Sequence, residues 1–166
     1  MKKFLFAIFL FINLTNSSFS NEKIFFVDLE KILNESKSGK LVINELNKIN
    51  NKNLEILKVK EKEIKTDEDE INKVKNLINQ DELENKMKDL RIKISQYNEM
   101  RNKMITDFNT YREKKFNDFF NAINPLIQNF MIENDIAILI DKKNIFIGSK
   151  KNDITANVID LINSKL

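Results

Sequence analysis

The chain has 166 residues, of which 42% are hydrophobic and 32% are charged, with 28 Lys and Arg against 25 Asp and Glu. It contains no His and no Cys, which excludes zinc sites built on imidazole or thiolate and nucleophilic catalysis by Cys or by a Ser–His pair. We therefore expect neither an enzyme nor a cofactor. The length, and the lack of a linker rich in Gly, Pro or Ser, indicate a single domain.

The first twenty residues have the three parts of an export signal. Lys2 and Lys3 form a basic start, Phe4–Ile12 is an uninterrupted apolar run, and Ser18 and Ser20 place small residues at a cleavage site. The apolar run is much shorter than the ~20 residues that a membrane-spanning helix needs. We therefore predict a signal peptide at residues 1–20 and a mature domain at residues 21–166, with a retained membrane anchor as the alternative.

Two short segments, far apart in the sequence, have β-strand composition. Lys23–Asp28 is aromatic and β-branched, and Ile136–Asp141 is apolar enough to be buried on both faces. Ile145–Ile147 follows the second segment after a short polar stretch, which predicts a hairpin. The expected body, residues 21–37 and 134–166, therefore holds three or four short strands.

A short helix is expected near the end of the chain. Asp153 and Thr155 mark its start, where the Asp153 carboxylate can cap the helix by accepting hydrogen bonds from the first free amides. The helix then carries an apolar stripe that should cover the sheet, made of Ile154, Val158, Leu161 and Ile162.

Such a small sheet cannot bury a self-sufficient core, so its apolar side chains need further cover. One source of cover is self-association through the body residues Ile24, Phe26, Ile136, Ile138, Ile140, Ile145 and Ile147. The other is the base of the helical segment, which offers Phe116, Phe119, Phe120, Ile123 and Phe130. The two are compatible.

The region between the strand segments, about residues 38–133, is charged and helix-forming. Its second half has apolar residues at alternating steps of four and three, which is the seam of a coiled coil: Leu83, Met87, Leu90, Ile94, Tyr97, Met104, Phe108 and Tyr111. The first half repeats more weakly, at Ile43, Leu57, Ile64, Ile71 and Ile78, and has polar residues at the other seam positions, namely Asn50, Asn53, Lys60 and Asp67. Polar seam residues reduce stability, so this arm should bend and open locally.

The two helices should reverse direction at Asn79–Asp81, with Asp81 as the cap of the return helix and Glu84 completing the cap. Pro125 either kinks the return helix or begins a new one. The expected fold class is α+β, mainly α: a small β body with a long antiparallel coiled-coil hairpin inserted between the first strand and the later ones.

The two ends of the chain carry a resemblance to a known family. The run from Lys23 to Leu33 (KIFFVDLEKIL), followed by Gly39, resembles the opening of mature chains in the Skp/OmpH family of periplasmic chaperones. Asn134–Asp141 (NDIAILID) and Asp153–Ile159 (DITANVI) are similar to that family's closing strand and final helix start. The resemblance covers the mature chain in layout but matches motifs only at the ends.

Membership would imply a periplasmic homotrimer whose arms hold unfolded outer-membrane β-barrel proteins without ATP. Candidate client contacts on the arm are Met87, Arg91, Tyr97, Met100, Arg101 and Met104, because thioethers adapt to irregular partners and cations attract acidic stretches. These side chains can equally be ordinary seam and surface residues.

A structural coiled-coil adaptor without chaperone activity is the alternative function. Nucleic acid is not an expected partner, because acidic residues are interspersed among the lysines and the export signal points outside the cytoplasm. Contact with a membrane surface stays open, because acidic clusters such as Thr66–Glu70 interrupt an arm that is strongly basic in the best-known family members.

Overall fold

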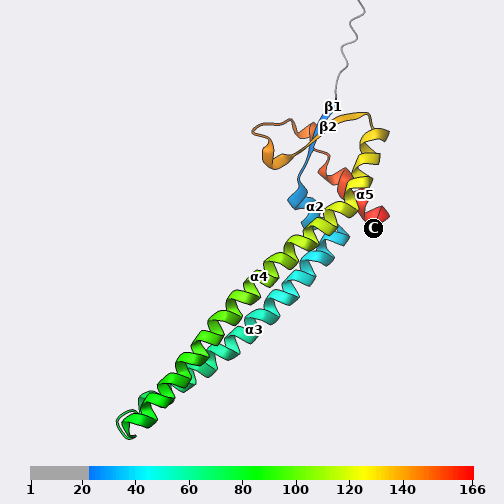
Figure 1. Ribbon diagram of the computed structural model, residues 1–166. Helices are drawn as coiled ribbons and strands as arrows, with labels where there is room; N and C mark the ends of the chain where they lie inside the picture. Colours follow the sequence, from blue (N-terminus) through cyan, green and yellow to red (C-terminus); the bar gives the residue numbers. More distant parts are fainter. Residues whose placement is uncertain (1–22) are drawn as a thin grey trace, which may run out of the picture.

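The computed structural model describes residues 23–166. The predicted signal peptide lies outside the described residues. The described part has a small body at one end and one long helical hairpin that projects from it (Figure 1). In chain order the elements are β1 (Lys23–Val27), α2 (Leu29–Glu35), α3 (Lys37–Val74), α4 (Gln80–Glu133), β2 (Ile136–Asp141), two 3₁₀ turns η1 (Lys142–Asn144) and η2 (Lys150–Asn152), and α5 (Thr155–Lys165). This confirms the predicted fold class.

The sheet has two strands within residues 23–166, β1 and β2, and they run parallel. Ile24 lies opposite Ile138, and Phe26 lies opposite Ile140. The predicted hairpin after β2 is wrong, because the Asp141 carboxylate accepts a hydrogen bond from the Lys143 amide and turns the chain into η1. The segment that contains Ile145–Ile147 is therefore a loop and not a third strand.

The chain leaves β1 through a short helix that the sequence analysis did not single out. Asp28 caps α2 by accepting from the Lys31 amide at 2.9 Å, and the buried Ser36 caps α3 by accepting from the Gly39 amide at 3.1 Å. A Cβ atom on Gly39 would lie 2.1 Å from the Leu33 carbonyl oxygen. Glycine at this position is therefore what lets α2 and α3 approach each other so closely.

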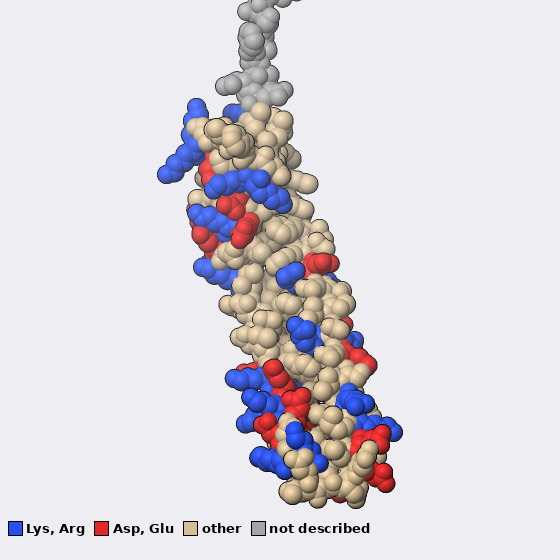
Figure 2. All heavy atoms as spheres, turned by 90° about the vertical axis from the view of Figure 1, so that its left-hand side faces the viewer, with Lys and Arg blue, Asp and Glu red and all other residues tan. Residues whose placement is uncertain are grey.

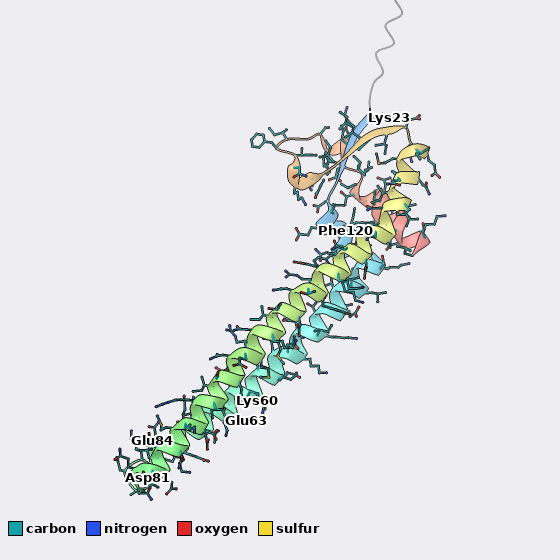
Figure 3. The ribbon with its side chains drawn as sticks, viewed as in Figure 1. Lys23, Lys60, Glu63, Asp81, Glu84 and Phe120 are labelled. Atoms are coloured by element: carbon teal, nitrogen blue, oxygen red, sulfur yellow. The ribbon has the colours of Figure 1, made fainter. Side chains whose placement is uncertain are left out.

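The hairpin arm consists of α3 and the antiparallel first part of α4. The 38 residues of α3 give it a length of about 57 Å. The reversal follows α3 directly, and Asn79 caps α4 by accepting from the Glu82 amide at 2.9 Å. The predicted cap, Asp81, is wrong: Asp81 and Glu84 lie in the first turns of α4 at the far end of the arm (Figure 3).

Pro125 lies inside α4, which is continuous from Gln80 to Glu133. Of the two alternatives, a new helix beginning at Pro125 is therefore wrong. A proline inside a helix removes one hydrogen bond and favours a bend. The last turns of α4, coloured yellow, stand more upright than the rest of the helix in Figure 1.

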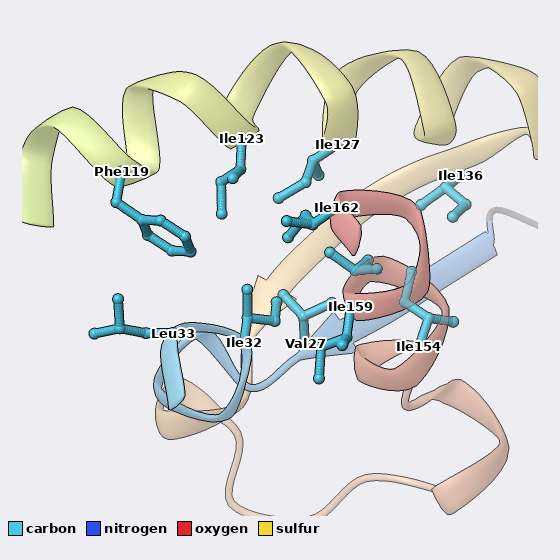
Figure 4. Close-up of a cluster of buried hydrophobic side chains, with 11 residues drawn as sticks. Val27, Ile32, Leu33, Phe119, Ile123, Ile127, Ile136, Ile154, Ile159 and Ile162 are labelled. Carbon is cyan, nitrogen blue, oxygen red and sulfur yellow. The ribbon is translucent and has the colours of Figure 1, made fainter. Parts of the chain in front are cut away.

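One buried cluster holds the body together (Figure 4). It joins one strand residue of β1, the short helix α2, the final part of α4, the start of β2 and the inner face of α5: Val27, Ile32, Leu33, Phe119, Ile123, Ile127, Ile136, Ile154, Val158, Ile159 and Ile162. Phe116, Phe120 and Phe130 pack against its edge. The base of the arm thus supplies cover for the sheet, which was one of the two predicted sources.

A network of hydrogen bonds joins the end of β1 to the start of α5. The Ile154 amide donates to the Phe26 carbonyl at 3.0 Å, and the Asp28 amide donates to the buried Thr155 hydroxyl at 2.9 Å. That hydroxyl in turn donates to the Asp153 carboxylate, which also accepts from the Thr155 amide at 3.0 Å. The Lys142 ammonium lies between the carboxylates of Asp28, at 3.5 Å, and Asp153, at 3.8 Å.

Asp153 therefore joins the start of α5 to the rest of the body. It makes the predicted hydrogen bond to the first amide of α5, that of Thr155, although Ile154 occupies the N-cap position. Burial raises the pKa of the Asp153 carboxyl, but hydrogen bonds from Thr155 and the charge of Lys142 outweigh burial and hold the pKa below its ordinary value of 3.8. A lowered pKa in the folded protein adds stability above the ordinary pKa, and this stability is lost as the pH falls through the folded value.

Replacing Asp153 with Asn should lower the free energy of unfolding by about 1 kcal/mol at pH 6, because the charged acceptor is lost. The difference from the unmodified chain should shrink at pH 3, because below the ordinary pKa of 3.8 the unfolded chain binds a proton more readily than the folded carboxyl does. Urea unfolding followed by circular dichroism at equal protein concentration measures both differences. Asp160→Asn, an exposed change on the same helix, is the control; an equal loss at the two pH values would contradict the assignment.

Replacing Gly39 with Ala should lower the free energy of unfolding by about 1–3 kcal/mol, because the new methyl group overlaps the Leu33 carbonyl. In an ordinary helix interior the same change is stabilising. Asn47→Ala, at an exposed position of α3, is the control and should be neutral or stabilising in the same urea titration. A stabilising Gly39→Ala would show that α2 and α3 can separate freely.

Candidate binding surface of the helical arm

The two helices of the arm pack loosely against each other. The seam side chains of α4, such as Met87, Tyr97 and Met104, are half-buried. In the arm, the buried apolar side chains are Leu46 and Ile71 on α3 and Leu90 on α4. Because the other seam residues keep part of their apolar surface in solvent, the arm presents a long surface of mixed character.

Two ion pairs connect α3 with α4 among the described residues. Near the base, the Lys115 ammonium lies 2.9 Å from the Glu45 carboxylate and 5.3 Å from the centre of the Tyr111 ring, and the Tyr111 hydroxyl also donates to Glu45. Further along the arm, the Lys93 ammonium donates to the Asp67 carboxylate. We call these the base ion pair and the distal ion pair.

Both ion pairs favour the charged form of their lysine, and the base ion pair also favours the charged form of Glu45. Hydrogen bonds from Tyr111 and Lys115 lower the pKa of the Glu45 carboxyl, and the bond to Glu45 raises the pKa of the Lys115 ammonium. The bond to Asp67 likewise raises the pKa of the Lys93 ammonium. The pairs lie at the surface, so they help to set how the helices align more than they stabilise the arm.

Shallow clefts open along the seam, and two of them contain four of the six predicted client-contact residues. The turn cleft, about 410 Å³, is lined by Met87 and Arg91 together with Ile78 and Leu83. The distal cleft has a volume of about 350 Å³, and its apolar lining residues are Ile71, Val74 and Leu90. The central cleft, about 310 Å³, is lined by Lys60, Glu63, Ile64, Lys93, Gln96, Tyr97 and Met100.

The remaining predicted contacts lie outside these clefts: Arg101 is exposed and Met104 is half-buried in the seam. The sequence analysis missed Lys93, which lines both the distal and the central cleft. The one hint in the sequence is Asp67, a polar residue at a seam position of α3, but the sequence does not show which cation of α4 it meets. Lys60 and Glu63, which form an ion pair at 2.6 Å along α3, mark the central cleft in Figure 3.

The predicted body residues fall into two groups. Ile24 and Ile138 lie side by side on the sheet with 44% and 43% of their surface exposed, and Ile147 protrudes from the loop after β2 beside the fully exposed Phe146. Ile136 is buried in the core cluster. The other residues are covered within the chain: Phe26 is buried, and Ile140 and Ile145 are half-buried.

No metal-binding cluster of acidic, His or Cys side chains occurs in residues 23–166. Within the same range, no helix combines the length and the apolar character needed to cross a membrane. The arm presents a long, mixed surface of apolar and charged side chains. These features define an arm-bearing protein with an extended contact surface.

The family of the chain follows from comparison with known proteins. The family model described as outer membrane protein (OmpH-like) matches residues 23–162, so the chain belongs to the OmpH-like family. A crystal structure described as a candidate outer membrane chaperone (OmpH-like) from Caulobacter crescentus has the same fold, with a TM-score of 0.76 and 17% identity over 89% of this chain and 87% of that chain. No curated protein matches the chain.

Proposed function

We propose that this protein is an ATP-independent periplasmic holding chaperone that binds unfolded outer-membrane β-barrel proteins between helical arms and keeps them from aggregating. Membership of the OmpH-like family supports a chaperone role. The observation that carries the proposal is the arm itself. Its helices extend about 57 Å from a small body, which is much further than packing against that body requires.

The surface of the arm suits weak binding at many places. Its seam residues are half-buried, and Leu54, Val59, Ile92 and Ile105 expose between 46% and 56% of their surface among charged neighbours. An unfolded chain can make many weak contacts with such a surface, and their combined effect is large because all of them are tethered to one body. No single contact needs to be tight, so the client can be released without ATP.

We further propose that three chains assemble through their bodies. Ile24 and Ile138 form an exposed apolar pair on the sheet, and the loop after β2 exposes 98% of Phe146 and 83% of Ile147. Contiguous exposed apolar side chains commonly mark an interface. A closed ring of three bodies would place three arms around one space, and several arms are needed to surround a client.

Chaperone activity can be tested by diluting a urea-unfolded porin into buffer with residues 21–166 and following light scattering. We expect the chain to suppress aggregation. A shortened arm that lacks residues 50–63 and 97–110 removes two heptads from each helix and keeps the seam in register. About two to five times more of this variant should be needed for half suppression, because contacts are lost. If the porin aggregates unchanged at a molar excess of the chain with the full-length arm, the adaptor alternative is favoured.

The proposed assembly can be tested with Ile138→Asp, which places a charge in the exposed apolar pair. Because Ile138 is already 43% exposed in the single chain, the variant should keep its helical circular dichroism but sediment as a monomer. Asn85→Asp adds the same charge at an exposed position near the end of the arm and should leave a trimer. A monomeric unmodified chain at micromolar concentration, or a trimeric Ile138→Asp, would refute the assembly.

A further inference from the structure

We infer that Met87 and Met100 are oxidation sites, at which a peroxide converts apolar contact surface of the arm into polar surface. The consequence of the modification rests on the proposed function, because the loss of apolar contact weakens the hold on a client. The modification itself concerns the protein alone and is measurable without a client.

The sulfur atoms of the chain are concentrated on one helix of the arm. The sequence has five Met and neither Cys nor Trp, so methionine is the side chain that a peroxide oxidises most readily here. Residues 21–166 keep four of these Met, of which Met87, Met100 and Met104 lie on the arm part of α4 and none lies on α3. The fourth, Met131, packs against the core cluster of the body. Oxidation of sulfur is therefore mainly a modification of the arm.

Met87 and Met100 lie where the seam is open to solvent. Met87 lines the turn cleft and Met100 lines the central cleft, and both side chains are half-buried. A peroxide can therefore reach either thioether while the two helices stay in contact. The distal cleft lies between these two along the arm, and its apolar lining residues are Ile71, Val74 and Leu90, with no Met. The distal cleft keeps its apolar character when the other two are oxidised.

Each thioether is a large part of the apolar surface that its cleft offers. In both clefts, Met is one of three aliphatic or aromatic side chains among the lining residues, and the others are polar or charged. On the face shown in Figure 2, charged side chains gather over the distal part of the arm and leave uncharged surface there only in patches. Making one side chain polar therefore removes much of what each cleft can contribute to an apolar partner.

Cations in the same two clefts suit the oxidised side chains. Arg91 lines the turn cleft one helical turn after Met87, and Lys93 lines the central cleft together with Met100. A sulfoxide oxygen accepts hydrogen bonds, which guanidinium and ammonium groups donate. The Lys93 ammonium already donates to Asp67 but has three hydrogens in all. After oxidation these cations can bind the new oxygen atoms, so the clefts become hydrogen-bonded polar sites.

The modification is a two-electron oxygen transfer from hydrogen peroxide to sulfur. A lone pair of the thioether sulfur attacks one peroxide oxygen, the O–O bond breaks and an S–O bond forms. The departing hydroxide takes the proton from the transferred oxygen and leaves as water. Sulfur is thus oxidised to the sulfoxide and the peroxide is reduced, and a methionine sulfoxide reductase with a thiol reductant reverses the change.

Treatment of residues 21–166 with hydrogen peroxide, followed by peptide mass spectrometry, locates the sulfoxides. We expect Met87 and Met100 each to gain one oxygen atom while the helical circular dichroism stays unchanged, because both thioethers are reachable in the folded arm. Binding of an apolar fluorescent dye should fall, and methionine sulfoxide reductase with a thiol should restore it. If Met87 and Met100 stay unmodified under conditions that oxidise Met131, the inference is overturned.

Met87→Leu combined with Met100→Leu removes both sulfur atoms and nearly conserves the apolar volume. Each protein is compared with itself before and after peroxide. For the unmodified chain, about threefold more oxidised protein should be needed for half suppression of porin aggregation, whereas peroxide should not change the amount of this variant. Met104→Leu with Met131→Leu removes two sulfur atoms outside the clefts and is the matched control, which should stay as sensitive as the unmodified chain. Equal protection in both variants, or none in the first, would contradict the assignment.

Dye binding and porin aggregation separate the inference from the proposed function. If peroxide lowers dye binding to the unmodified chain but not to the variant without the cleft Met, and porin aggregates with or without the chain, the inference stands and the proposed function fails. If the chain suppresses aggregation equally well before and after Met87 and Met100 are oxidised, the inference fails and the proposed function stands.

Discussion

The parallel pairing of β1 with β2 is the constraint on which the rest of the structure depends. β1 ends at Val27 and β2 begins at Ile136, so every residue between them belongs to one connection that leaves the sheet and returns to it. A parallel pair always needs a crossover, and one helix is usually enough. Here the crossover contains two long helices that cannot all pack against so small a sheet. An arm that projects from the body is the result.

The network of hydrogen bonds around Thr155 joins the end of β1 to the start of α5 and so holds the body closed. Two strands alone are a marginal sheet, but the Ile154 amide adds a bond to the Phe26 carbonyl and α5 then covers one face. The final part of α4 closes the core with Phe119, Ile123 and Ile127. The base of the arm is thus part of the body, and what happens further out on the arm need not disturb the core.

Packing decreases from the body into the arm and then partly recovers toward the turn, and this pattern connects the structure with the proposed function. A holding chaperone has to contact many unrelated segments, which a rigid and well-packed surface does poorly. Half-buried seam residues such as Tyr97 and Met104 keep the hairpin formed while leaving apolar surface available. Polar seam residues lower the stability of the arm, and the same residues allow it to adapt.

Sequence alone determined the elements whose signal is local and repeated. The steps of four and three from Leu83 to Tyr111 predicted the return helix, and the family followed from motifs near the two ends. The helix cap was predicted less well, because Asn79, Asp81 and Glu84 all have side chains suited to a helix start and only the path of the backbone selects Asn79.

Tertiary structure alone decided that Ile145–Ile147 is a loop. A strand requires a neighbouring strand, and within the described chain the turn at Asp141 directs this segment across Phe26 instead. It also decided that Pro125 lies within one continuous helix and that Lys93 meets Asp67 across the arm, because both depend on contacts between residues that the local pattern cannot relate.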